Sequence, residues 1–234
     1  MIADAQSAAG KLYIVSTPIG NLGDMTYRGI DVLKSVSMIA AEDTRTSRRL
    51  LDHYEISTAM LSYHDFNKEH VTPRLLEKIQ SGNDLALITD AGTPLVSDPG
   101  FYLVRAAIAV GLEVIPIPGP SALLAAVVGA GLPTDRFVFE GFLPKKKGRQ
   151  TRLKQLADDP RTLVIYESPQ RIERTLRDIR AAWGNRPVVI ARELTKKFEE
   201  FIRGELNDVL QKLDGKTLKG EIVLIIGGNL DRKA

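Results

Sequence analysis

The stretch Thr89–Gly100 constrains the fold of this chain more than any other part of its sequence. It follows the apolar run Leu85–Ile88, which is typical of a buried strand, and precedes Tyr102–Val110, where apolar and small residues recur at helical spacing. Two glycines, two prolines, two aspartates and a serine stand in this one connection. A loop of this kind, at the carboxyl end of a central strand, binds ligands in open α/β sheets. A rigid turn without a ligand is the alternative interpretation.

The turn residues of this stretch have separate effects on the backbone. Gly92 and Gly100 allow close approaches that a side chain would block, whereas Pro94 and Pro99 fix their own backbone. Asp98 before Pro99 predicts a helix N-cap with proline at the first helical position.

Apolar runs alternate with helical patterns throughout the first half of the chain. The predicted strands are Lys11–Val15, Met38–Ala41, Ala59–Tyr63, Leu85–Ile88 and Glu113–Ile117. Helices are predicted at Thr72–Ile79 and after a cap at Asp43 or Thr44. This alternation predicts an N-terminal α/β domain at residues 11–117, with a mostly parallel sheet and helices on both faces.

A different pattern begins at Pro118, where two prolines flank a glycine and end the preceding strand. The predicted strands beyond it are Phe137–Phe139, Leu163–Tyr166, Val188–Ala191, Glu200–Arg203 and Ile222–Ile226. The predicted helices are Ala122–Val128, Arg152–Leu156, Gln170–Trp183 and Leu206–Leu213. Too few residues separate the third and fourth of these strands for a helical crossover, so we expect them to pair antiparallel. Residues 118–234 therefore read as a C-terminal α+β domain with a mixed sheet.

The composition excludes several classes of function. The chain has no cysteine, and its three histidines lie at spacings that match no metal motif, so we expect no metal site. No apolar run approaches the roughly 18 residues of a membrane span, and residues 1–10 lack the features of a signal peptide. We expect a soluble cytoplasmic protein. The net charge of +3 permits a nucleic-acid partner without requiring one.

Common nucleotide and hydrolase motifs are absent from the sequence, including the P-loop, the dinucleotide fingerprint and the nucleophile elbow. What remains is a set of turn-rich loops at strand ends. They are Ser16–Asn21, Asp90–Gly100, Pro118–Ala122 and Tyr166–Pro169. Because these loops come from both domains, a cleft between the domains is the predicted ligand site.

The same loops carry the motifs of a known family. In chain order the motifs are Leu12–Leu22, Ala41–Arg45, Asp90–Gly100, Pro118–Ala122, Tyr166–Ser168, Ala191–Lys196 and Lys219–Leu224. With these motifs the chain resembles the ribosomal RNA small-subunit methyltransferase I branch of the tetrapyrrole methylase superfamily, from about Lys11 to Gly227. The loop Ser16–Asn21 lacks the glycine-rich signature of the corrin and porphyrin methylases, which favours the RNA branch.

The resemblance implies a two-domain, homodimeric enzyme that depends on S-adenosylmethionine. Its expected reaction is methylation of the ribose 2'-hydroxyl of a cytidine in the decoding region of 16S ribosomal RNA. Relatives in this branch usually continue into a small helical extension, whereas this sequence stops at Ala234. We expect that difference to affect RNA affinity.

The resemblance also implies a set of cofactor contacts. They are Pro18 and Ile19 beneath the cofactor, Asp90, Gly92, Leu95 and Val96 along its amino-acid and ribose part, Ser121 and Ala122 at its polar groups, and Tyr166 and Leu194 on the second-domain side. Backbone amides, carboxylates and apolar walls suit the polar and apolar parts of this cofactor. The apolar members have ordinary core packing as their alternative role.

Methyl transfer to a ribose hydroxyl needs in-line positioning and removal of a weakly acidic proton. Four candidates for the base stand at strand ends: Asp43, Glu167, Glu193 and Lys196, with Arg45 as an orienting or phosphate-binding group. A lysine base needs a lowered pKa. Spacing does not choose among them, because Glu167 alternatively caps a helix and Glu193 with Lys196 alternatively forms a solvated ion pair.

Two basic clusters are predicted to bind RNA phosphates. The first is Arg45, Arg48 and Arg49, which share one helical face by their spacing. The second follows an apolar turn and consists of Lys145, Lys146, Lys147, Arg149, Arg152 and Lys154. Phosphate contacts of this kind supply affinity independent of sequence, although a charge run is alternatively a solvated surface.

Two other functions compete with RNA methylation. A methyltransferase of a small tetrapyrrole, such as a corrin or porphyrin precursor, would share the cofactor loops, but the basic run Lys145–Lys147 and the first loop disfavour it. A non-catalytic RNA-binding module has no need for cofactor loops, and this chain has them at every expected position.

Overall fold

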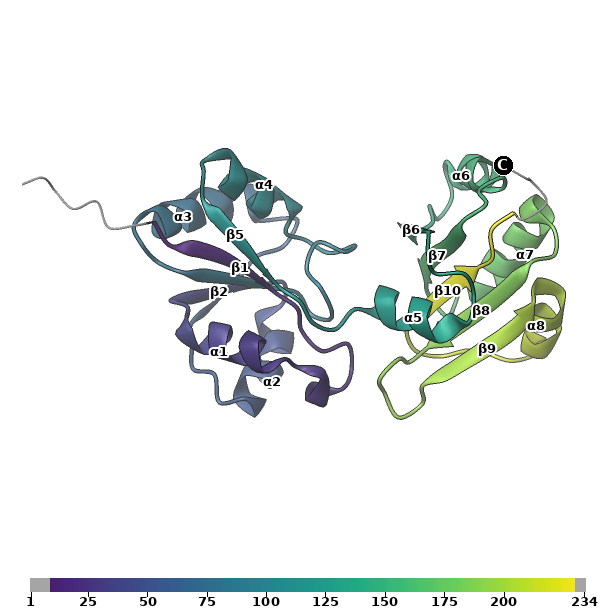
Figure 1. Ribbon diagram of the computed structural model, residues 1–234, viewed down its shortest axis with the longest axis horizontal. Coiled ribbons are helices and arrows are strands. Elements are labelled where there is room, and N and C mark those ends of the chain that lie inside the picture. Colours follow the sequence, from purple (N-terminus) through teal and green to yellow (C-terminus); the bar gives the residue numbers. More distant parts are fainter. Residues whose placement is uncertain (1–8, 230–234) are drawn as a thin grey trace, which may run out of the picture. The chain divides into compact units, whose positions relative to one another are not determined.

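The computed structural model describes residues 9–229 and divides into two compact units, of which the first ends at Ser121 and the second begins at Ala122 (Figure 1). Each unit contains a five-stranded sheet of its own. Residues 118–121 connect the last strand of the first unit to the first helix of the second. We retain residues 11–117 and 118–234 as the proposed domains.

A parallel sheet forms the centre of the first unit, which confirms the predicted α/β fold. Its strands are β1 (Lys11–Val15), β2 (Met38–Ala41), β3 (Met60–Ser62), β4 (Leu85–Ile88) and β5 (Glu113–Ile117). They follow the order β3-β2-β4-β1-β5, and each neighbouring pair is parallel. The carboxyl ends of these strands therefore lie at one edge of the sheet, with buried β4 in the middle.

Helices cover both faces of this sheet, as predicted (Figure 1). After a short 3-10 turn, η1 (Leu22–Asp24), they are α1 (Tyr27–Ser35), α2 (Thr44–His53), α3 (Lys68–Gln80) and α4 (Phe101–Ala109). Successive side chains of β4 point to opposite faces. Ala86 and Ile88 pack in the core beneath α1 and α2, whereas Leu85 and Leu87 pack in the core beneath α3 and α4. Every residue of β4 is apolar because helices cover both faces of the sheet.

In the first unit, two helix starts differ from the sequence prediction. Helix α3 begins at Lys68 rather than at residue 72, and Pro73 is accommodated inside it. Helix α4 begins at Phe101 with Gly100 as its N-cap, so the predicted cap at Asp98 was wrong. Gly100 adopts φ 135°, and a Cβ there would lie 2.7 Å from Leu87 Cδ2. The helix therefore starts after this tight glycine approach instead of at the preceding Asp–Pro pair.

The second unit contains the predicted mixed sheet. Its strands are β6 (Phe137–Phe142), β7 (Thr162–Glu167), β8 (Pro187–Arg192), β9 (Glu200–Glu205) and β10 (Ile222–Ile226). They follow the order β6-β7-β10-β8-β9. β6 and β7 are parallel, whereas the other neighbouring pairs are antiparallel, including β8 with β9 as predicted.

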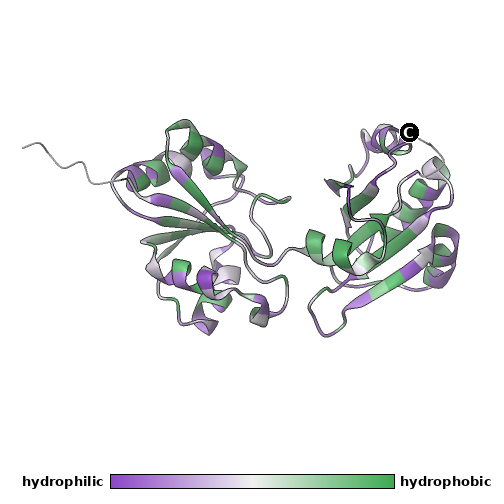
Figure 2. Cartoon of the chain, in the orientation of Figure 1, coloured by the Kyte–Doolittle hydropathy of each residue, from purple (hydrophilic) through white to green (hydrophobic). Residues whose placement is uncertain are grey.

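Four helices of the described chain pack on this mixed sheet. They are α5 (Ala122–Ala130), α6 (Arg149–Leu156), α7 (Ile172–Trp183) and α8 (Leu206–Leu213). The last three share one apolar core with the sheet. Helix α5 contacts β8, β9 and β10 and is hydrophobic almost all round (Figure 2). Gly129 allows this close packing, because a Cβ there would lie 2.5 Å from Phe201 Cζ.

Among residues 9–229, no helix has the length and apolar character needed to cross a membrane. The same described residues include no group of histidine, cysteine and carboxylate side chains arranged to hold a metal ion.

Candidate functional site

Three loops of the first unit meet at the carboxyl edge of its parallel sheet. Thr17 N donates to the Gly92 carbonyl oxygen at 2.9 Å, and Gly92 N donates to the Thr17 carbonyl oxygen at 3.0 Å. The hydroxyl of Thr93 donates to the Pro120 carbonyl oxygen at 3.1 Å. The hydroxyls of Ser16 and Thr93 lie 3.0 Å apart in a further hydrogen bond. The loops after β1, β4 and β5 therefore form one hydrogen-bonded structure, which we call the loop junction.

Glycine is required at two points of the loop junction. Gly92 has φ 88°, and a Cβ there would lie 3.3 Å from Ile19 Cγ2. At Gly119 a Cβ would lie 2.9 Å from the Cβ of Ser16. Larger residues at either point would push the loops apart. The two glycines therefore allow the loops to pack closely against one another.

The loop after β4 also holds two non-glycine residues in the left-handed region. Leu95 has φ 74° and Ser97 has φ 71°. Such conformations cost about 1–3 kcal/mol each and cluster at ligand clamps and active sites. Backbone strain in this loop is therefore a second indication of a ligand site.

Three carboxylates, those of Glu42, Asp90 and Asp98, lie beside the loop junction. Thr89 Oγ1 donates to Glu42 Oε2 at 2.6 Å, and Asp43 N donates to Asp90 Oδ1 at 3.1 Å. Burial raises the pKa of Asp98 to about 6, and the nearby charge of Glu42 adds to this shift. Burial likewise raises the pKa of Asp90. This cluster concentrates negative charge where a cationic ligand group would be stabilised.

Glu42, Thr89 and Asp98 were missed as members of this cluster by the sequence analysis. Glu42 directly follows β2, and Thr89 directly follows β4. The two strands are neighbours in the sheet although the segment containing β3 separates them in the sequence. The available signal was the polar residue at each strand end, but only the strand order shows that these ends are adjacent.

The predicted cofactor residues fall into two groups in the structure. Those in the loops of the first unit are Pro18, Ile19, Asp90, Gly92, Leu95, Val96 and Ser121. Gly92 contacts the loop of Pro18 and Ile19 through the bridge to Thr17.

The remaining predicted cofactor residues, Ala122, Tyr166 and Leu194, belong to the second unit. Tyr166 lies in β7 and makes edge contacts with the rings of Phe139 and Phe142, at centroid distances of 4.9 and 5.7 Å. Leu194 is buried just after β8, and Ala122 begins α5. These three residues keep their predicted role as a proposal.

Among the predicted catalytic residues, Asp43 caps a helix. It is the N-cap of α2, and its Oδ1 accepts the Arg45 backbone N–H at 2.8 Å. The Arg45 guanidinium also donates to both carboxylate oxygens. These bonds to Arg45 lower the pKa of Asp43 to about 2, so its carboxylate is charged at neutral pH.

Glu167 is enclosed by its own hydrogen bonds. Its side chain is buried and accepts from Ser168 N at 2.7 Å, from Arg171 Nε at 2.7 Å and from Thr175 Oγ1 at 2.6 Å. Helix α7 begins at Ile172 with Arg171 at the cap position, so Glu167 does not have the alternative role of helix cap. Glu167 instead joins the end of β7 to the first turns of α7.

Glu193 and Lys196 form a partly buried ion pair rather than the solvated one considered from sequence. Lys196 Nζ lies 3.1 Å from Glu193 Oε1 and 3.2 Å from Glu221 Oε1. The backbone N–H of Glu221 lowers the pKa of Glu193, and Lys196 lowers it further. Burial alone would lower the pKa of Lys196, but its carboxylate partners outweigh burial and the net shift is upward. The lowered lysine pKa that base catalysis requires is therefore absent at Lys196.

Comparison with known proteins assigns the chain to a family. Residues 11–210 match the family model of the Tetrapyrrole (Corrin/Porphyrin) Methylases. The ribosomal RNA small subunit methyltransferase I of Synechocystis sp. is 51% identical over 221 residues, which are 94% of this chain and 79% of that protein. Its counterpart in Escherichia coli O157:H7 is 48% identical over 229 residues, which are 96% of this chain and 80% of that protein. The chain belongs to the ribosomal RNA small subunit methyltransferase I family.

Solved structures support the fold of this methyltransferase family member. Diphthine synthase aligns with a TM-score of 0.71 at 13% identity and covers 93% of this chain and 90% of its own. Uroporphyrin-III C-methyl transferase from Thermus thermophilus, complexed with S-adenyl homocysteine, aligns with a TM-score of 0.65 at 20% identity and covers 93% of this chain and 97% of its own. At these identities the likeness extends to the fold.

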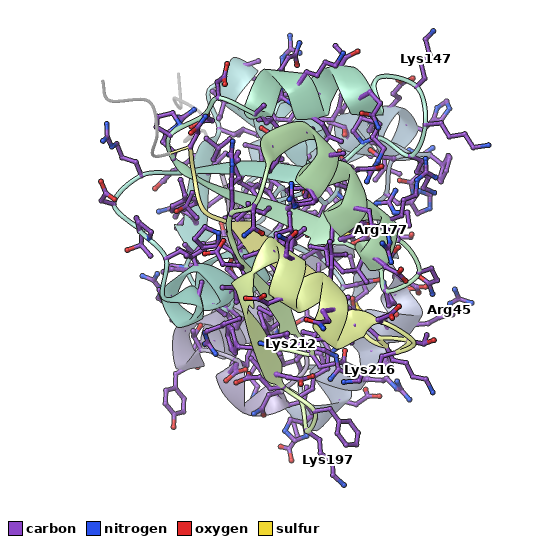
Figure 3. The ribbon with its side chains drawn as sticks, turned by 90° about the vertical axis from the view of Figure 1, so that its right-hand side faces the viewer. Arg45, Lys147, Arg177, Lys197, Lys212 and Lys216 are labelled. Carbon is purple, nitrogen blue, oxygen red and sulfur yellow. The ribbon has the colours of Figure 1, made fainter. Side chains whose placement is uncertain are left out.

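The first basic cluster of this methyltransferase family member is accessible. Arg45, Arg48 and Arg49 are exposed on α2, and Arg45 points away from the ribbon of its helix (Figure 3). The side chain of Arg45 is 89% exposed even though it pairs with Asp43. The predicted shared face of this cluster therefore faces solvent.

The second basic cluster divides into exposed lysines and a buried arginine. Lys145, Lys146 and Lys147 are exposed, and Lys147 extends from its loop (Figure 3). Arg149 is only 4% exposed, and its guanidinium donates to Asp178 at 2.8 Å. The guanidinium of Arg149 also donates to the Thr175 hydroxyl and the Pro144 carbonyl oxygen. Because these bonds engage Arg149 in the interior, we leave it out of the proposed RNA surface.

Arg152 lies between these extremes, because it is partly exposed but bound to a carboxylate. Its Nε and Nη2 donate to the two carboxylate oxygens of Glu140 at 2.8 and 2.6 Å. Both residues line a surface cavity of about 470 Å³ beside Gly148 and Phe142. The second basic cluster therefore contains both exposed lysines and arginines whose hydrogen bonds stabilise the fold.

Proposed function

We propose that this chain transfers a methyl group from S-adenosylmethionine to the ribose 2'-hydroxyl of a cytidine in the decoding region of 16S ribosomal RNA. Membership of the family supports the reaction and the substrate class, with relatives that are 51% and 48% identical. The structural observation that carries the proposal is the loop junction of Thr17, Gly92 and Thr93. It gathers three of the family's motifs at one edge of the sheet.

The loop junction fits this cofactor by its chemistry. When bound, S-adenosylmethionine supplies a methyl group attached to a positively charged sulfur. The carboxylates of Asp90 and Asp98 suit its cationic groups, and Ile19 and Leu95 suit its apolar parts. Gly92 allows the loop after β4 to pack closely against Ile19, which keeps the junction together. We also propose Pro18, Val96, Ser121, Ala122, Tyr166 and Leu194 as cofactor contacts, on the family resemblance.

Positioning supplies the larger part of catalysis in this proposal. Asp43, with its pKa near 2, is a weak base, and the raised pKa of Lys196 keeps its ammonium protonated. The carboxylate of Glu167 is occupied by three donors. We therefore assign Glu167, Glu193 and Lys196 to holding the loops after β7 and β8, while Asp43 orients Arg45. With none of these groups acting as the base, the proton released from the 2'-hydroxyl on methylation passes to solvent water. In-line positioning lowers such barriers by roughly 7–11 kcal/mol in the best cases.

The proposed RNA contacts are the exposed cations of the two basic clusters. They are Arg45, Arg48, Arg49, Lys145, Lys146, Lys147 and, with its guanidinium shared with Glu140, Arg152. Phosphate contacts from these residues would hold the RNA without reading its sequence.

We further propose that the protein is a homodimer and acts in the cytoplasm, where small ribosomal subunits assemble. The family resemblance supports both statements. Light scattering at micromolar protein concentration tests the dimer: a mass of two chains supports it, and a mass of one chain removes it.

The experiment that tests the proposed function is transfer of labelled methyl groups from S-adenosylmethionine to small ribosomal subunits that lack their own ribose methylation. Mapping of a single 2'-O-methylcytidine in the decoding region would support cofactor, reaction and substrate together. Transfer to a small tetrapyrrole, with none to the subunits, would overturn the RNA assignment in favour of the alternative enzyme. Calorimetry without any heat of cofactor binding would overturn the methyltransferase assignment itself.

A further inference from the structure

A basic surface pocket lies in the second unit and shares no residue with the two clusters described above. Its volume is about 580 Å³. The charged residues that line it are Arg192, Glu200, Lys212, Lys216 and Lys219. Four cations therefore face a single carboxylate, which leaves the pocket with a net charge of +3. Lys212 and Lys216 come from the end of α8 and the loop after it (Figure 3).

The cations of this basic pocket differ in how firmly they are held. Arg192 donates to Glu200 Oε2 at 3.0 Å and to the carbonyl oxygen of Lys219 at 3.3 and 3.2 Å, so its guanidinium is held in place by these bonds. Lys212 donates to the Arg203 carbonyl oxygen at 3.1 Å. Among the described contacts, the ammonium groups of Lys216 and Lys219 have no hydrogen-bond or ion-pair partner, and both residues are exposed. They are therefore available to an anionic ligand.

An exposed aromatic ring belongs to the loop beside this pocket. Phe198 is 65% exposed, and Arg192 donates from Nη1 to its carbonyl oxygen at 3.4 Å. The ammonium of Lys197 lies 5.7 Å from the centre of the Phe198 ring. A basic groove with an exposed aromatic side chain is the combination that binds single-stranded nucleic acid, because bases stack on the ring while phosphates contact the cations.

We propose that the basic pocket and Phe198 form a binding site for a single-stranded segment of the RNA substrate, with a phosphate in the pocket and a base stacked on Phe198. This proposal rests on the proposed function, because it takes RNA to be the substrate. It adds an attachment point that the sequence did not indicate, since its cations are spread over residues 192–219 among acidic residues.

The test is the salt dependence of binding of a fluorescein-labelled single-stranded RNA decamer to the full chain. The double variant Lys216→Gln/Lys219→Gln removes two exposed charges that make no internal contact. We expect weaker binding and a plot of log K against log salt that is shallower by about 0.7, because the one phosphate contact of the pocket is lost. The matched control, Lys34→Gln/Lys78→Gln, removes two exposed charges from the first unit and should leave the slope unchanged.

A second variant tests the stacking contact. Phe198→Leu keeps an apolar side chain but removes the flat ring, so we expect RNA affinity to fall roughly tenfold with the salt slope unchanged. Circular dichroism of each variant confirms that the chain remains folded.

The pocket and the proposed function fail in different ways. Methyl transfer by the wild type, together with an unchanged salt slope for the lysine variant, would overturn the pocket alone. A reduced slope without methyl transfer by the wild type would uphold the pocket and count against the function. Loss of polyglutamate binding in the lysine variant, with RNA binding intact, would overturn the pocket in favour of an acidic protein partner.

Discussion

At the loop junction, the fold changes the pKa of Asp98. Burial raises its pKa from 3.8 to about 6, and the negative charges of Glu42 and Asp90 act in the same direction. The folded state therefore binds this proton more tightly than the unfolded state. The contribution of Asp98 to stability is fully present below about pH 4 and is lost as the pH rises through about 6.

The variant Asp98→Asn isolates this effect, because its side chain does not titrate. We expect the unfolding free energy of the wild type, relative to Asp98→Asn, to fall between about pH 4 and pH 7. Urea unfolding at several pH values measures it. Asp159→Asn is a control of opposite sign, because Arg161 lowers the pKa of Asp159. The unfolding free energy of the wild type, relative to Asp159→Asn, should fall on acidification. A pH-independent difference for Asp98→Asn would contradict the prediction.

Two glycines with similar φ angles allow the effect of backbone strain to be distinguished from the effect of a close contact. Gly92 has φ 88° and lies against Ile19, whereas Gly111 has φ 75° and a Cβ there would have nothing within 4 Å. We expect both Gly92→Ala and Gly111→Ala to lower stability by about 1–2 kcal/mol because of the left-handed backbone. Only Gly92→Ala should also weaken S-adenosylmethionine binding in calorimetry. Equal cofactor affinity in the two variants would remove Gly92 from the site.

At the scale of elements, two glutamate–arginine pairs of the same spacing differ in burial. Glu167 with Arg171 joins β7 to α7, and the Glu167 side chain is fully buried. Glu173 with Arg177 lies on the surface of α7, with side chains 52% and 60% exposed. The first pair connects two elements, whereas the second lies along one helix.

The substitution Glu167→Gln should therefore cost about 3 kcal/mol, because it leaves partly buried Arg171 without its charged partner. Glu173→Gln should cost at most about 0.5 kcal/mol, as expected of a solvated pair. Urea unfolding compares the two variants. Similar stabilities would show that Glu167 is not the structural link between β7 and α7.

Helix α6 shows why a basic run in the sequence is an incomplete guide to a binding surface. Arg149, Leu153 and Leu156 follow at helical spacing and all point inward. Arg149 thus belongs to the buried face, where Asp178 and Thr175 receive its hydrogen bonds. The spacing was visible in the sequence, but an arginine on an apolar helical face becomes a structural residue only when its acceptors are brought to it by another helix.

At the scale of the whole molecule, RNA binding is predicted to depend on separate surfaces. The triple variant Lys145→Ala/Lys146→Ala/Lys147→Ala should weaken RNA binding and flatten its salt dependence, because each lost phosphate contact reduces the slope by about 0.7–0.9. Cofactor affinity should not change. Filter binding over a range of salt concentrations measures the slope. An unchanged slope would assign Lys145–Lys147 to ordinary solvated surface.

Local sequence patterns determined much of the fold of this protein. β4 is apolar at every position because it is buried on both faces, and such a run is typical of a buried strand. The short separation of β8 and β9 required antiparallel pairing. A helix cap at Asp43 or Thr44 was recognisable from the residues that follow, and the structure has it at Asp43. The turn-rich loops at strand ends were likewise visible, because glycine and proline have conformational effects that need no distant partner.

Tertiary structure alone decided which of these parts act together. The order β3-β2-β4-β1-β5 places Glu42 beside Thr89 and links Thr17 with Gly92, although each pair is more than forty residues apart in the sequence. In the basic pocket, Arg192 likewise meets Lys219, which lies 27 residues further along the sequence. Burial, pKa and hydrogen-bond partners depend on neighbours that strand order brings into contact. The sequence by itself therefore determined the elements and their loops, and the packing of those elements decided the chemistry at each loop.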